Sequence, residues 1–384
     1  MADRVNAPAP LKFAGPHIDE ATIAGVAEVL RSGYIASGPW VERFERELSQ
    51  LCEGRRVRAV TSATAAVEIA LQLVGIGPGD EVVTCAQSFF TVLNMIVKVG
   101  ATPVLVDCDL VTRNIDLAQA AARAGPRTKA ILPTYWPGSL PDLDALHGLA
   151  RERGWRVIED AALVLGSRWK GRPVGAFGDI TTFSFHPNKN ITTIEGGALV
   201  VNDDAEAHRI DALRFHGIVR VADGTRDVAF PGGKFNLPDV NARVGVGQLA
   251  QLPGFLARRR ALVEHYFARF PADVDCVLPP RPVAGDGQSW NMFCVLLPLD
   301  RMTIDRRRFR DLLAERGIAT GVSYEALHLS ALGRRFGYHR GDLPITERIS
   351  DSTVTLPLHV NLSDADVDRV CNACGEILRA HRKA

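Results

Sequence analysis

The sequence lacks an excess of charge and a long apolar run, and each absence excludes a class of protein. Its 45 Lys and Arg residues nearly balance 44 Asp and Glu residues, which leaves a net charge of +1 over 384 residues. Such a chain has no global field to hold a nucleic-acid backbone or an anionic membrane surface. No apolar run approaches the roughly 20 residues of a membrane span, and the start MADRVNAPAP has no apolar signal core. We therefore expect neither nucleic acid nor a membrane as a partner.

A disulfide pattern is also missing. The seven cysteines are an odd number in a long chain without a secretory signal, which indicates reduced thiols and a cytoplasmic location. Cys371 and Cys374 are spaced as CxxC, but they lie in a stretch that is typical of a C-terminal helix, and no second pair completes a zinc site. We interpret both as packing residues and expect no metal.

Short apolar runs alternate with helical stretches, which is the pattern of βαβ units and a mostly parallel sheet. The predicted strands lie at 57–62, 81–86, 102–109, 128–134 and 155–160, and the predicted helices at 63–76, 90–100 and 143–154. This predicts a three-layer α/β domain. One or two long helices at 241–270 precede a smaller α+β unit, so we divide the chain into a large domain, 1–250, with an N-terminal arm, and a small C-terminal domain, 251–384.

Polar segments follow several of the predicted strands, and open parallel sheets bind ligands beyond the carboxyl ends of their strands. Ser62, Ala63 and Thr64 form a strand-to-helix turn whose free N–H groups suit a phosphate. An ordinary helix N-cap would look the same. Asp160 closes the strand at 155–160, where a carboxylate can hydrogen-bond a protonated ring nitrogen or serve only as a surface or capping acid.

Lysine is scarce, with seven residues against 38 arginines. Lys189 lies in TTFSFHPNKNITTIEGG, between Ser184 and a pair of glycines. Arginine cannot form a Schiff base, whereas a lysine amine can lose its proton and attack an aldehyde. A lone lysine is more often simply solvated, so this signal needs its context. Phe89, which follows a strand, can stack on a flat ring or be an ordinary core aromatic.

Together these segments resemble the DegT/StrS family of sugar aminotransferases, which are fold type I enzymes that use pyridoxal 5′-phosphate. The resemblance covers nearly the whole chain, through IDEATIAGVAEVLRSGYIASGPW, TSATAAVEIAL, VIEDAALVLGS, FSFHPNKN with EGG, KFNLPDVNA and TVTLPLHVNLSDADVDRV. Within the family, FHPNKNITTIEGG and GGKFNLPD most resemble enzymes that aminate the 4-keto carbon of UDP-linked sugars. The enzyme for UDP-4-amino-4-deoxy-L-arabinose in lipid A modification is one of these.

The resemblance implies a role for each candidate residue. Lys189 is the catalytic residue that forms the Schiff base, Asp160 keeps the pyridine nitrogen protonated, and Phe89 stacks on the ring. The resemblance also implies a phosphate site that a neighbouring subunit completes, and hence a homodimer with composite active sites. Its residues are Ser62, Ala63, Thr64 and Ser184, with Asn236 of KFNLPD from the neighbouring subunit.

The chain also departs from the family pattern. Leu163 stands where Gln or His commonly lies near the 3-oxygen of the cofactor, and it can offer no hydrogen bond there. Ile194 replaces the Gly that often precedes Glu-Gly-Gly. Tyr135 replaces a common His and is followed by Trp136, and these changes could reshape the pocket for the keto sugar.

The implied activity is transfer of the amino group of glutamate to a keto carbon, C4, of a nucleotide-linked sugar. The product would be an amino sugar for a polysaccharide or lipid A, and 2-oxoglutarate would leave. Two alternatives stay open at this point. One is a non-catalytic pyridoxal-phosphate-binding regulatory protein, which Leu163 suggests, and the other is a sugar dehydratase that uses the same cofactor. Relatives of the second kind carry histidine in place of Lys189.

Overall fold

The computed structural model describes residues 9–282 and 287–383. Its central sheet has seven strands in the order β1-β9-β8-β5-β4-β2-β3. Neighbouring strands are parallel except for the two pairs that β9 makes with β1 and β8. The strands are β1 (Arg56–Val60), β2 (Glu81–Cys85), β3 (Thr102–Val106), β4 (Thr128–Leu132), β5 (Arg156–Asp160), β8 (Ile180–Ser184) and β9 (Gly197–Val201). The five predicted strands are all present, with shorter bounds.

Helices cover both faces of this sheet, which confirms the predicted three-layer α/β fold. One face carries α3 (Ala63–Leu73), α4 (Phe90–Lys98) and α7 (Asp204–Leu213). The other face carries α2 (Pro39–Leu51), α5 (Leu117–Arg123), α6 (Leu143–Arg153) and the first part of α8 (Asp239–Arg269). Successive strand residues point to opposite faces, so Val157 belongs to the second core and Ile158 to the first.

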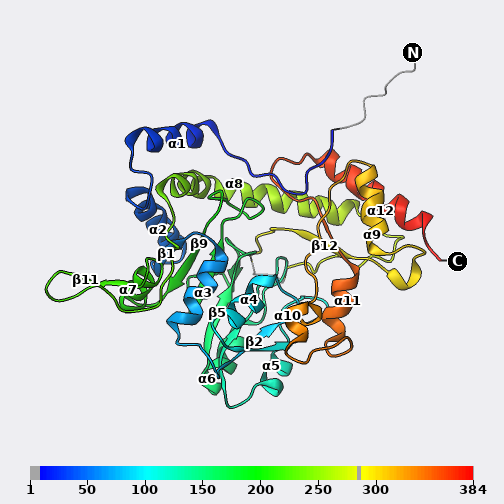
Figure 1. The fold of residues 1–384 in the computed structure, drawn as a ribbon. Helices are drawn as coiled ribbons and strands as arrows, with labels where there is room; N and C mark the ends of the chain where they lie inside the picture. The colour runs from blue at the N-terminus through cyan, green and yellow to red at the C-terminus, as the bar shows by residue number, and fades with distance from the viewer. Residues whose placement is uncertain (1–8, 283–286, 384) are drawn as a thin grey trace.

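Helix α8 is one continuous helix of 31 residues that runs through Pro253. Its first part packs against α1 (Glu20–Ser32) and α2, and its last part packs against α12 (Asp364–Ala380) (Figure 1). Phe255 still belongs to the core of the large sheet, whereas Leu262 belongs to the core of the C-terminal unit. The helix therefore joins two cores. The division at residue 250 stays a prediction.

The C-terminal unit is the expected α+β arrangement, with a two-stranded antiparallel sheet of β12 (Phe293–Leu296) and β13 (Thr353–Leu356). Cys371 and Cys374 lie in its buried core on α12. Leu11 of the N-terminal segment pairs with Ile318, so this part of the segment lies on the C-terminal unit. The other helices are η1 (Leu299–Arg301), α9 (Arg306–Glu315), η2 (Leu327–Leu329), α10 (Ala331–Arg334) and α11 (Pro344–Ser352).

Hydrogen bonds of the Asp107 carboxylate and of the backbone fix the C-terminal unit on the large sheet. Asp107, which follows β3, accepts from the N–H groups of Ile345 (2.9 Å) and Thr346 (2.6 Å) at the start of α11. The N–H of Leu327 donates to the carbonyl of Ala86, which follows β2, at 3.0 Å. These contacts hold the segment before η2 at the carboxyl edge of the sheet.

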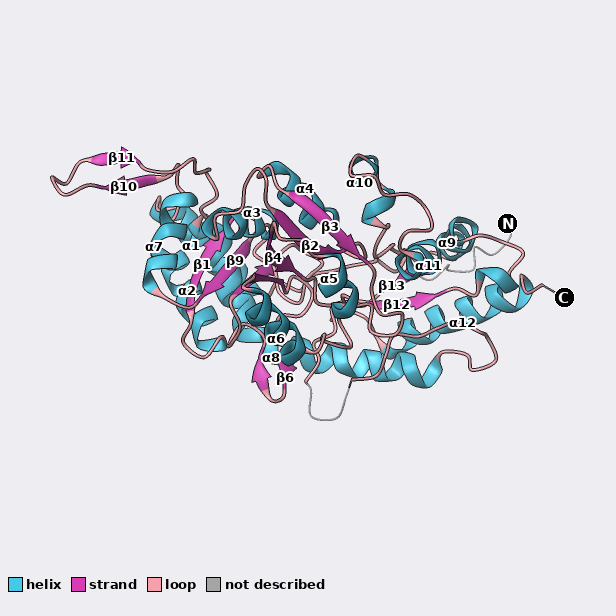
Figure 2. Cartoon of the chain, turned by 90° about the horizontal axis from the view of Figure 1, so that it is seen from below, coloured by secondary structure: helices cyan, strands magenta, loops and turns pink. Residues whose placement is uncertain are grey.

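Two small antiparallel pairs complete the structure. They are β6 (Arg168–Trp169) with β7 (Arg172–Pro173), and β10 (Ile218–Arg220) with β11 (Arg226–Val228). The β10–β11 hairpin projects from the body of the protein (Figure 2). Among residues 9–282 and 287–383, no helix combines the length and hydropathy that crossing a membrane requires. Most of the segment MADRVNAPAP, from which we inferred the lack of a signal core, lies outside the described residues.

Candidate active site

A cavity of about 210 Å³ lies at the carboxyl ends of β1, β2, β4, β5 and β8. Each of these strands delivers polar or aromatic residues to it, as expected for the edge of an open parallel sheet. The structure brings together all the predicted site residues except Asn236. Those that line the cavity are Ser62, Ala63, Thr64, Phe89, Asp160, Leu163, Ser184 and Lys189.

The turn from β1 into α3 forms an anion cradle. Ser62 is the N-cap of α3, and its Oγ accepts from the N–H of Ala65 at 3.0 Å. The N–H groups of Ala63 and Thr64 in the first helical turn have no partner within the helix, and the helix dipole favours negative charge there. A Cβ atom on Gly197 would lie 2.4 Å from the carbonyl carbon of Ser62. The second glycine of EGG therefore lets β9 pass directly beside the cradle.

Asp160 forms the part of the cavity wall that can hold a protonated ring nitrogen. Its side chain is 5% exposed and accepts from Thr134 Oγ1 at 3.1 Å and from the N–H of Ala162 at 3.2 Å. Burial raises the pKa of Asp160, and these hydrogen bonds and the charge of Lys189 oppose this rise. Ser88 Oγ lies 2.6 Å from Thr134 Oγ1 and extends the chain of hydroxyl groups. Thr134 was not predicted, although it stands at the end of a predicted strand.

Lys189 lies in a loop that hydrogen bonds fix from several directions. Asn291 Nδ2 donates to the carbonyl of Asn188 at 2.8 Å, and Asn190 Nδ2 donates to the carbonyl of Leu165 at 3.0 Å. Burial lowers the pKa of Lys189 from 10.5 to about 8, although the negative charge of Asp160 acts in the opposite direction. A larger share of this amine is therefore uncharged near neutral pH than for an ordinary lysine.

Arg259 of α8 reaches the same loop, and no motif in the sequence pointed to it. The side chain is 4% exposed, and Nη1 donates to the carbonyls of Trp290 (3.3 Å), Asn291 (3.1 Å) and Leu358 (3.0 Å). Its Nη2 donates to the carbonyl of Lys189 at 3.4 Å. Burial lowers its pKa to about 10. Arg259 thus ties the lysine loop to the C-terminal unit.

An aromatic group lies above the cavity. Phe89 is 51% exposed, so it is not a core residue, and its ring centre lies 5.6 Å from that of Tyr324. Tyr324 comes from the C-terminal unit, lines the same cavity and was not predicted. Its ring centre lies 5.5 Å from that of Trp136. The face of Phe89 is available for stacking on a flat ring.

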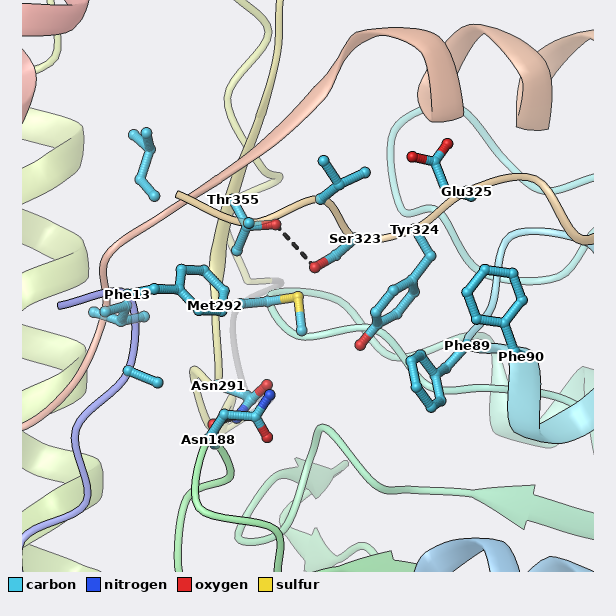
Figure 3. A pocket seen from close by; sticks show the side chains of 15 residues that line it. Phe13, Phe89, Phe90, Asn188, Asn291, Met292, Ser323, Tyr324, Glu325 and Thr355 are labelled. Carbon is cyan, nitrogen blue, oxygen red and sulfur yellow. Dashed lines mark hydrogen bonds between the residues drawn. The ribbon is translucent and has the colours of Figure 1, made fainter. Parts of the chain in front are cut away.

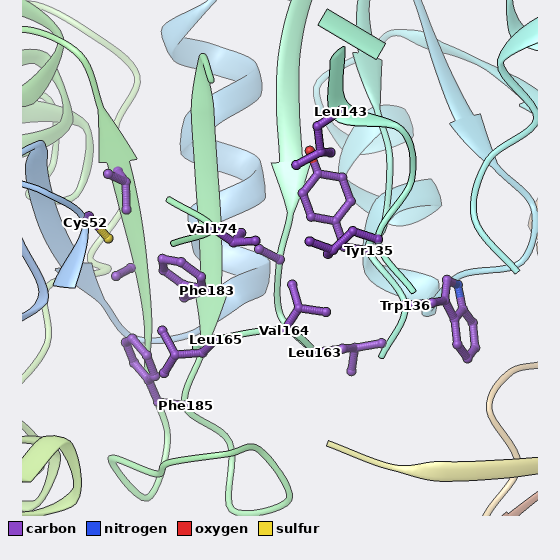
Figure 4. Packing of buried hydrophobic residues seen from close by; sticks show 14 of the residues in the cluster. Cys52, Tyr135, Trp136, Leu143, Leu163, Val164, Leu165, Val174, Phe183 and Phe185 are labelled. Carbon is purple, nitrogen blue, oxygen red and sulfur yellow. The ribbon is translucent and has the colours of Figure 1, made fainter. Parts of the chain in front are cut away.

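Of the residues that depart from the family pattern, one lines the cavity and others lie outside it. Leu163 lines the cavity, 3% exposed, and supplies an apolar wall where Gln or His would supply a polar one. Tyr135 and Trp136 are buried in the core behind that wall (Figure 4), and neither lines the cavity. Ile194 has φ of +71°, a left-handed conformation that favours glycine, which explains the glycine often found there in relatives.

Asn236 lies outside the cavity of its own chain. Its Nδ2 donates to Ser37 Oγ, its Oδ1 accepts from Lys234, and its backbone pairs with Val60 at the end of β1. The side chain therefore bonds the neighbouring Lys234 and Ser37 of a distant segment rather than its own backbone. Its predicted role toward a neighbouring subunit stays a prediction.

The residues present fit pyridoxal 5′-phosphate. The α3 cradle suits its phosphate, Asp160 suits its ring nitrogen, and Phe89 offers a face for its ring. Lys189 supplies an amine that is uncharged often enough to attack an aldehyde. A phosphate, a pyridine nitrogen and an aldehyde occur together in this one cofactor.

Residues 16–374 match the model of the DegT/DnrJ/EryC1/StrS aminotransferase family. Among solved structures, the chain is similar to the putative sugar aminotransferase Spr1654 from Streptococcus pneumoniae in its PLP-form, with 30% identity and a TM-score of 0.90 over 97% of this chain and 99% of that chain. It is also similar to the aminotransferase TlmJ from Streptoalloteichus hindustanus, with 34% identity and a TM-score of 0.89 over 96% and 99%. DesI, solved with its TDP-sugar product, shares 28% identity and a TM-score of 0.87 over 97% and 94%.

The lowered pKa of Lys189 predicts a pH dependence that does not require turnover. In protein freed of cofactor, the rate of covalent attachment of pyridoxal phosphate should rise with pH and reach half its maximum near pH 8, because only the uncharged amine attacks the aldehyde. Asp160→Asn removes a charge that raises this pKa, so the midpoint should move to lower pH. Borohydride trapping followed by peptide mass measures the rate. A midpoint above pH 10, or an upward shift in the variant, would contradict this account.

Arg259→Met should slow that attachment about tenfold or more, because the lysine loop loses its link to the C-terminal unit and small misplacements of a reacting group are costly. The matched control is Arg258→Met, since Arg258 donates to the carbonyl of Leu362 on the partly exposed side of the same helix. The control should change attachment less than twofold. Equal attachment in both variants, with both folded by circular dichroism, would show that Arg259 has no positioning role.

Proposed function

The chain belongs to the DegT/DnrJ/EryC1/StrS aminotransferase family, and on this premise we propose that it moves the amino group of glutamate to the C4 keto carbon of a UDP-linked sugar. The observation that carries the proposal is Lys189, with its lowered pKa, in one cavity with the α3 cradle and Asp160. Pyridoxal 5′-phosphate, the cofactor of this family, supplies an electron sink when bound. We propose that the amino sugar serves a polysaccharide or lipid A.

Each residue of the cavity has a stated task in this reaction. Lys189 Nζ takes the proton from the α-carbon of glutamate and later returns a proton to C4 of the sugar, as a positioned general base and acid. The carboxylate of Asp160 accepts a hydrogen bond from the ring N–H and stabilises its positive charge. The N–H groups of Ala63 and Thr64 hold the phosphate, and Phe89 fixes the plane of the ring.

The sugar part of the proposal rests on motifs and on relatives. The loop FHPNKNITTIEGG and the segment GGKFNLPD are similar to those of enzymes that act on UDP-linked 4-keto sugars. DesI was solved with a TDP-sugar as product, which supports a nucleotide-linked acceptor for this chain as well. Lys189 argues against a dehydratase, since the relatives with that activity carry histidine there.

The charges of the site support a homodimer with composite active sites. Among the described residues that line the cavity, only Lys189 and His186 can carry positive charge, yet the site must hold a phosphate and the carboxylates of glutamate. A second copy can bring Asn236 and further polar groups to it. Four large apolar side chains are exposed on α1 and the turn after it, which suits an interface between copies; they are Ile23, Leu30, Tyr34 and Ile35.

We also propose a cytoplasmic location. All seven cysteines are free in the structure, and six of them are buried. In this location the protein would meet its proposed substrates, the nucleotide-linked sugars.

The activity is tested with a panel of acceptors. Protein loaded with pyridoxamine phosphate should convert a UDP-linked 4-keto sugar to a product with the mass of the amino sugar, and glutamate should restore its amino group. The dTDP-linked, GDP-linked and 3-keto sugars of the panel should react at least tenfold more slowly. Lys189→Ala is the control, because it should fold and yet lose turnover by orders of magnitude. The proposal would be contradicted if none of the sugars in the panel were converted, or if Lys189→Ala formed the product at a near-normal rate.

The composite site is tested by mixing two inactive proteins. In a composite site, Lys189 comes from one chain and Asn236 from the other. A mixed dimer of Lys189→Ala with Asn236→Asp should therefore contain one intact site, and random exchange of subunits should restore up to about a quarter of the activity. Exchange is first demonstrated by native mass spectrometry. Absence of recovery after proven exchange, or a fully active monomer, would show that each chain builds its own site.

A further inference from the structure

A second cavity, of about 260 Å³, adjoins the cavity of Lys189 and shares Phe89, Asn188 and Tyr324 with it (Figure 3). It lies between the N-terminal segment, the lysine loop and the C-terminal unit. We propose that it binds the sugar ring of the acceptor and requires this ring to be uncharged, so that a uronate sugar is rejected. This inference rests on the proposed function and names the place and the class of its acceptor.

Rings and apolar side chains form two opposite walls of this cavity. Phe13 of the N-terminal segment lies beside Met292 on one side, and Tyr324 and Phe89 lie on the other (Figure 3). Such walls suit the C–H faces of a sugar ring, because these faces are apolar while the ring edge is polar. The volume has room for a single ring rather than for a whole nucleotide sugar.

Apart from Glu325, the polar side chains that line the cavity are neutral hydroxyl and amide groups, which can hydrogen-bond the edge of a sugar ring. The hydroxyl of Tyr324 points into the space between the walls, and the amides of Asn188 and Asn291 lie at its end (Figure 3). Thr355 Oγ1 donates to Ser323 Oγ at 2.8 Å, which leaves acceptor capacity on both oxygens. Burial raises the pKa of Tyr324, so its hydroxyl stays neutral. Hydroxyl and amide groups pair with the hydroxyl groups of a sugar.

The charges of the lining residues determine which part of a substrate this cavity can bind. Among the described residues that line this cavity there is no Lys, Arg or His, and the single charged group is Glu325. The carboxylate of Glu325 lies at the rim, 2.9 Å from Arg306 Nη2. A carboxylate or a diphosphate in this space would lose its hydration without gaining a cation, which is costly. The two carboxylates of glutamate and the diphosphate of the acceptor are therefore placed elsewhere.

The cavity is also prepared for a ligand before one binds. Arg259 donates to the carbonyls of Asn291 and Leu358, which both line this cavity, and to the carbonyl of Lys189. One buried side chain thus fixes two lining residues of the cavity relative to the amine of Lys189. A rigid site binds its ligand without the cost of ordering loops.

The test compares two matched ligands on the complete protein loaded with pyridoxal phosphate. UDP-glucose and UDP-glucuronate differ only in CH₂OH against carboxylate at C6, and calorimetry gives the affinity of each. We expect UDP-glucose to bind at least tenfold more tightly. Equal affinities, or tighter binding of UDP-glucuronate, would overturn the inference and leave the proposed aminotransfer intact. If neither ligand binds while glutamate still converts the cofactor, both the UDP-linked acceptor and this assignment are wrong.

A variant tests the location. Phe13→Ala removes one wall, so it should weaken binding of UDP-glucose at least tenfold and leave the glutamate half-reaction within twofold. Phe177→Ala is the control, because Phe177 lines a different hollow, with Asp179, near the opposite end of β5, and it should change neither quantity. The assignment would be overturned if Phe13→Ala weakened UDP-glucose binding and the glutamate half-reaction equally. It would also be overturned if the folded variant bound UDP-glucose as tightly as the unchanged protein.

Discussion

The burial of Lys189 beside Asp160 is the constraint on which the rest of the site depends. An amine that is to attack a carbonyl must be uncharged part of the time, and burial disfavours its charged form. The nearby carboxylate of Asp160, which we propose holds the ring nitrogen of the cofactor, acts against this by favouring the charged amine. Both groups therefore have to be placed accurately, and strands β5 and β8, which are neighbours in the sheet, carry them to the same edge.

The surrounding structure maintains this placement at some cost to stability. Arg259 is a buried cation whose recorded partners are backbone carbonyls rather than a carboxylate, and desolvation of such a group is unfavourable. Ile194 has a backbone conformation that glycine adopts more easily. Strain of this kind is common next to active sites, where the surrounding contacts hold a residue in an unfavourable state. The lysine loop is thus fixed from α8, from the C-terminal unit and from the sheet.

The two adjoining cavities divide the chemistry between them. The first contains the anion cradle and the ionisable groups, while the second offers rings, amides and hydroxyls with a carboxylate at its rim. Phe89, Asn188 and Tyr324 belong to both. This difference in polarity suits the proposed function, in which an anionic amino acid and the ring of a sugar react in turn at Lys189.

The sequence by itself determined the strands, the anion turn at Ser62 to Thr64, and the positions of Asp160 and Lys189. These features are local: a strand, its end and the following turn lie within a few residues, so periodicity and residue type reveal them. The resemblance of FSFHPNKN and EGG then indicated the family and the cofactor. Gly197 is the physical reason for part of that motif, since β9 passes against the cradle where a Cβ would not fit.

Only the tertiary structure decided the second cavity and the contacts that fix the lysine. Phe13, Arg259 and Tyr324 come from three segments far apart in the chain, and each has an unremarkable sequence context. Their proximity follows from long-range packing, namely from α8 passing between two cores and from the C-terminal unit resting on the carboxyl edge of the sheet. The predicted contact of Asn236 requires more than the fold of one chain, because it would lie in a second copy. Local pattern fixes which residue ends a strand, and packing over the whole chain fixes what that residue faces.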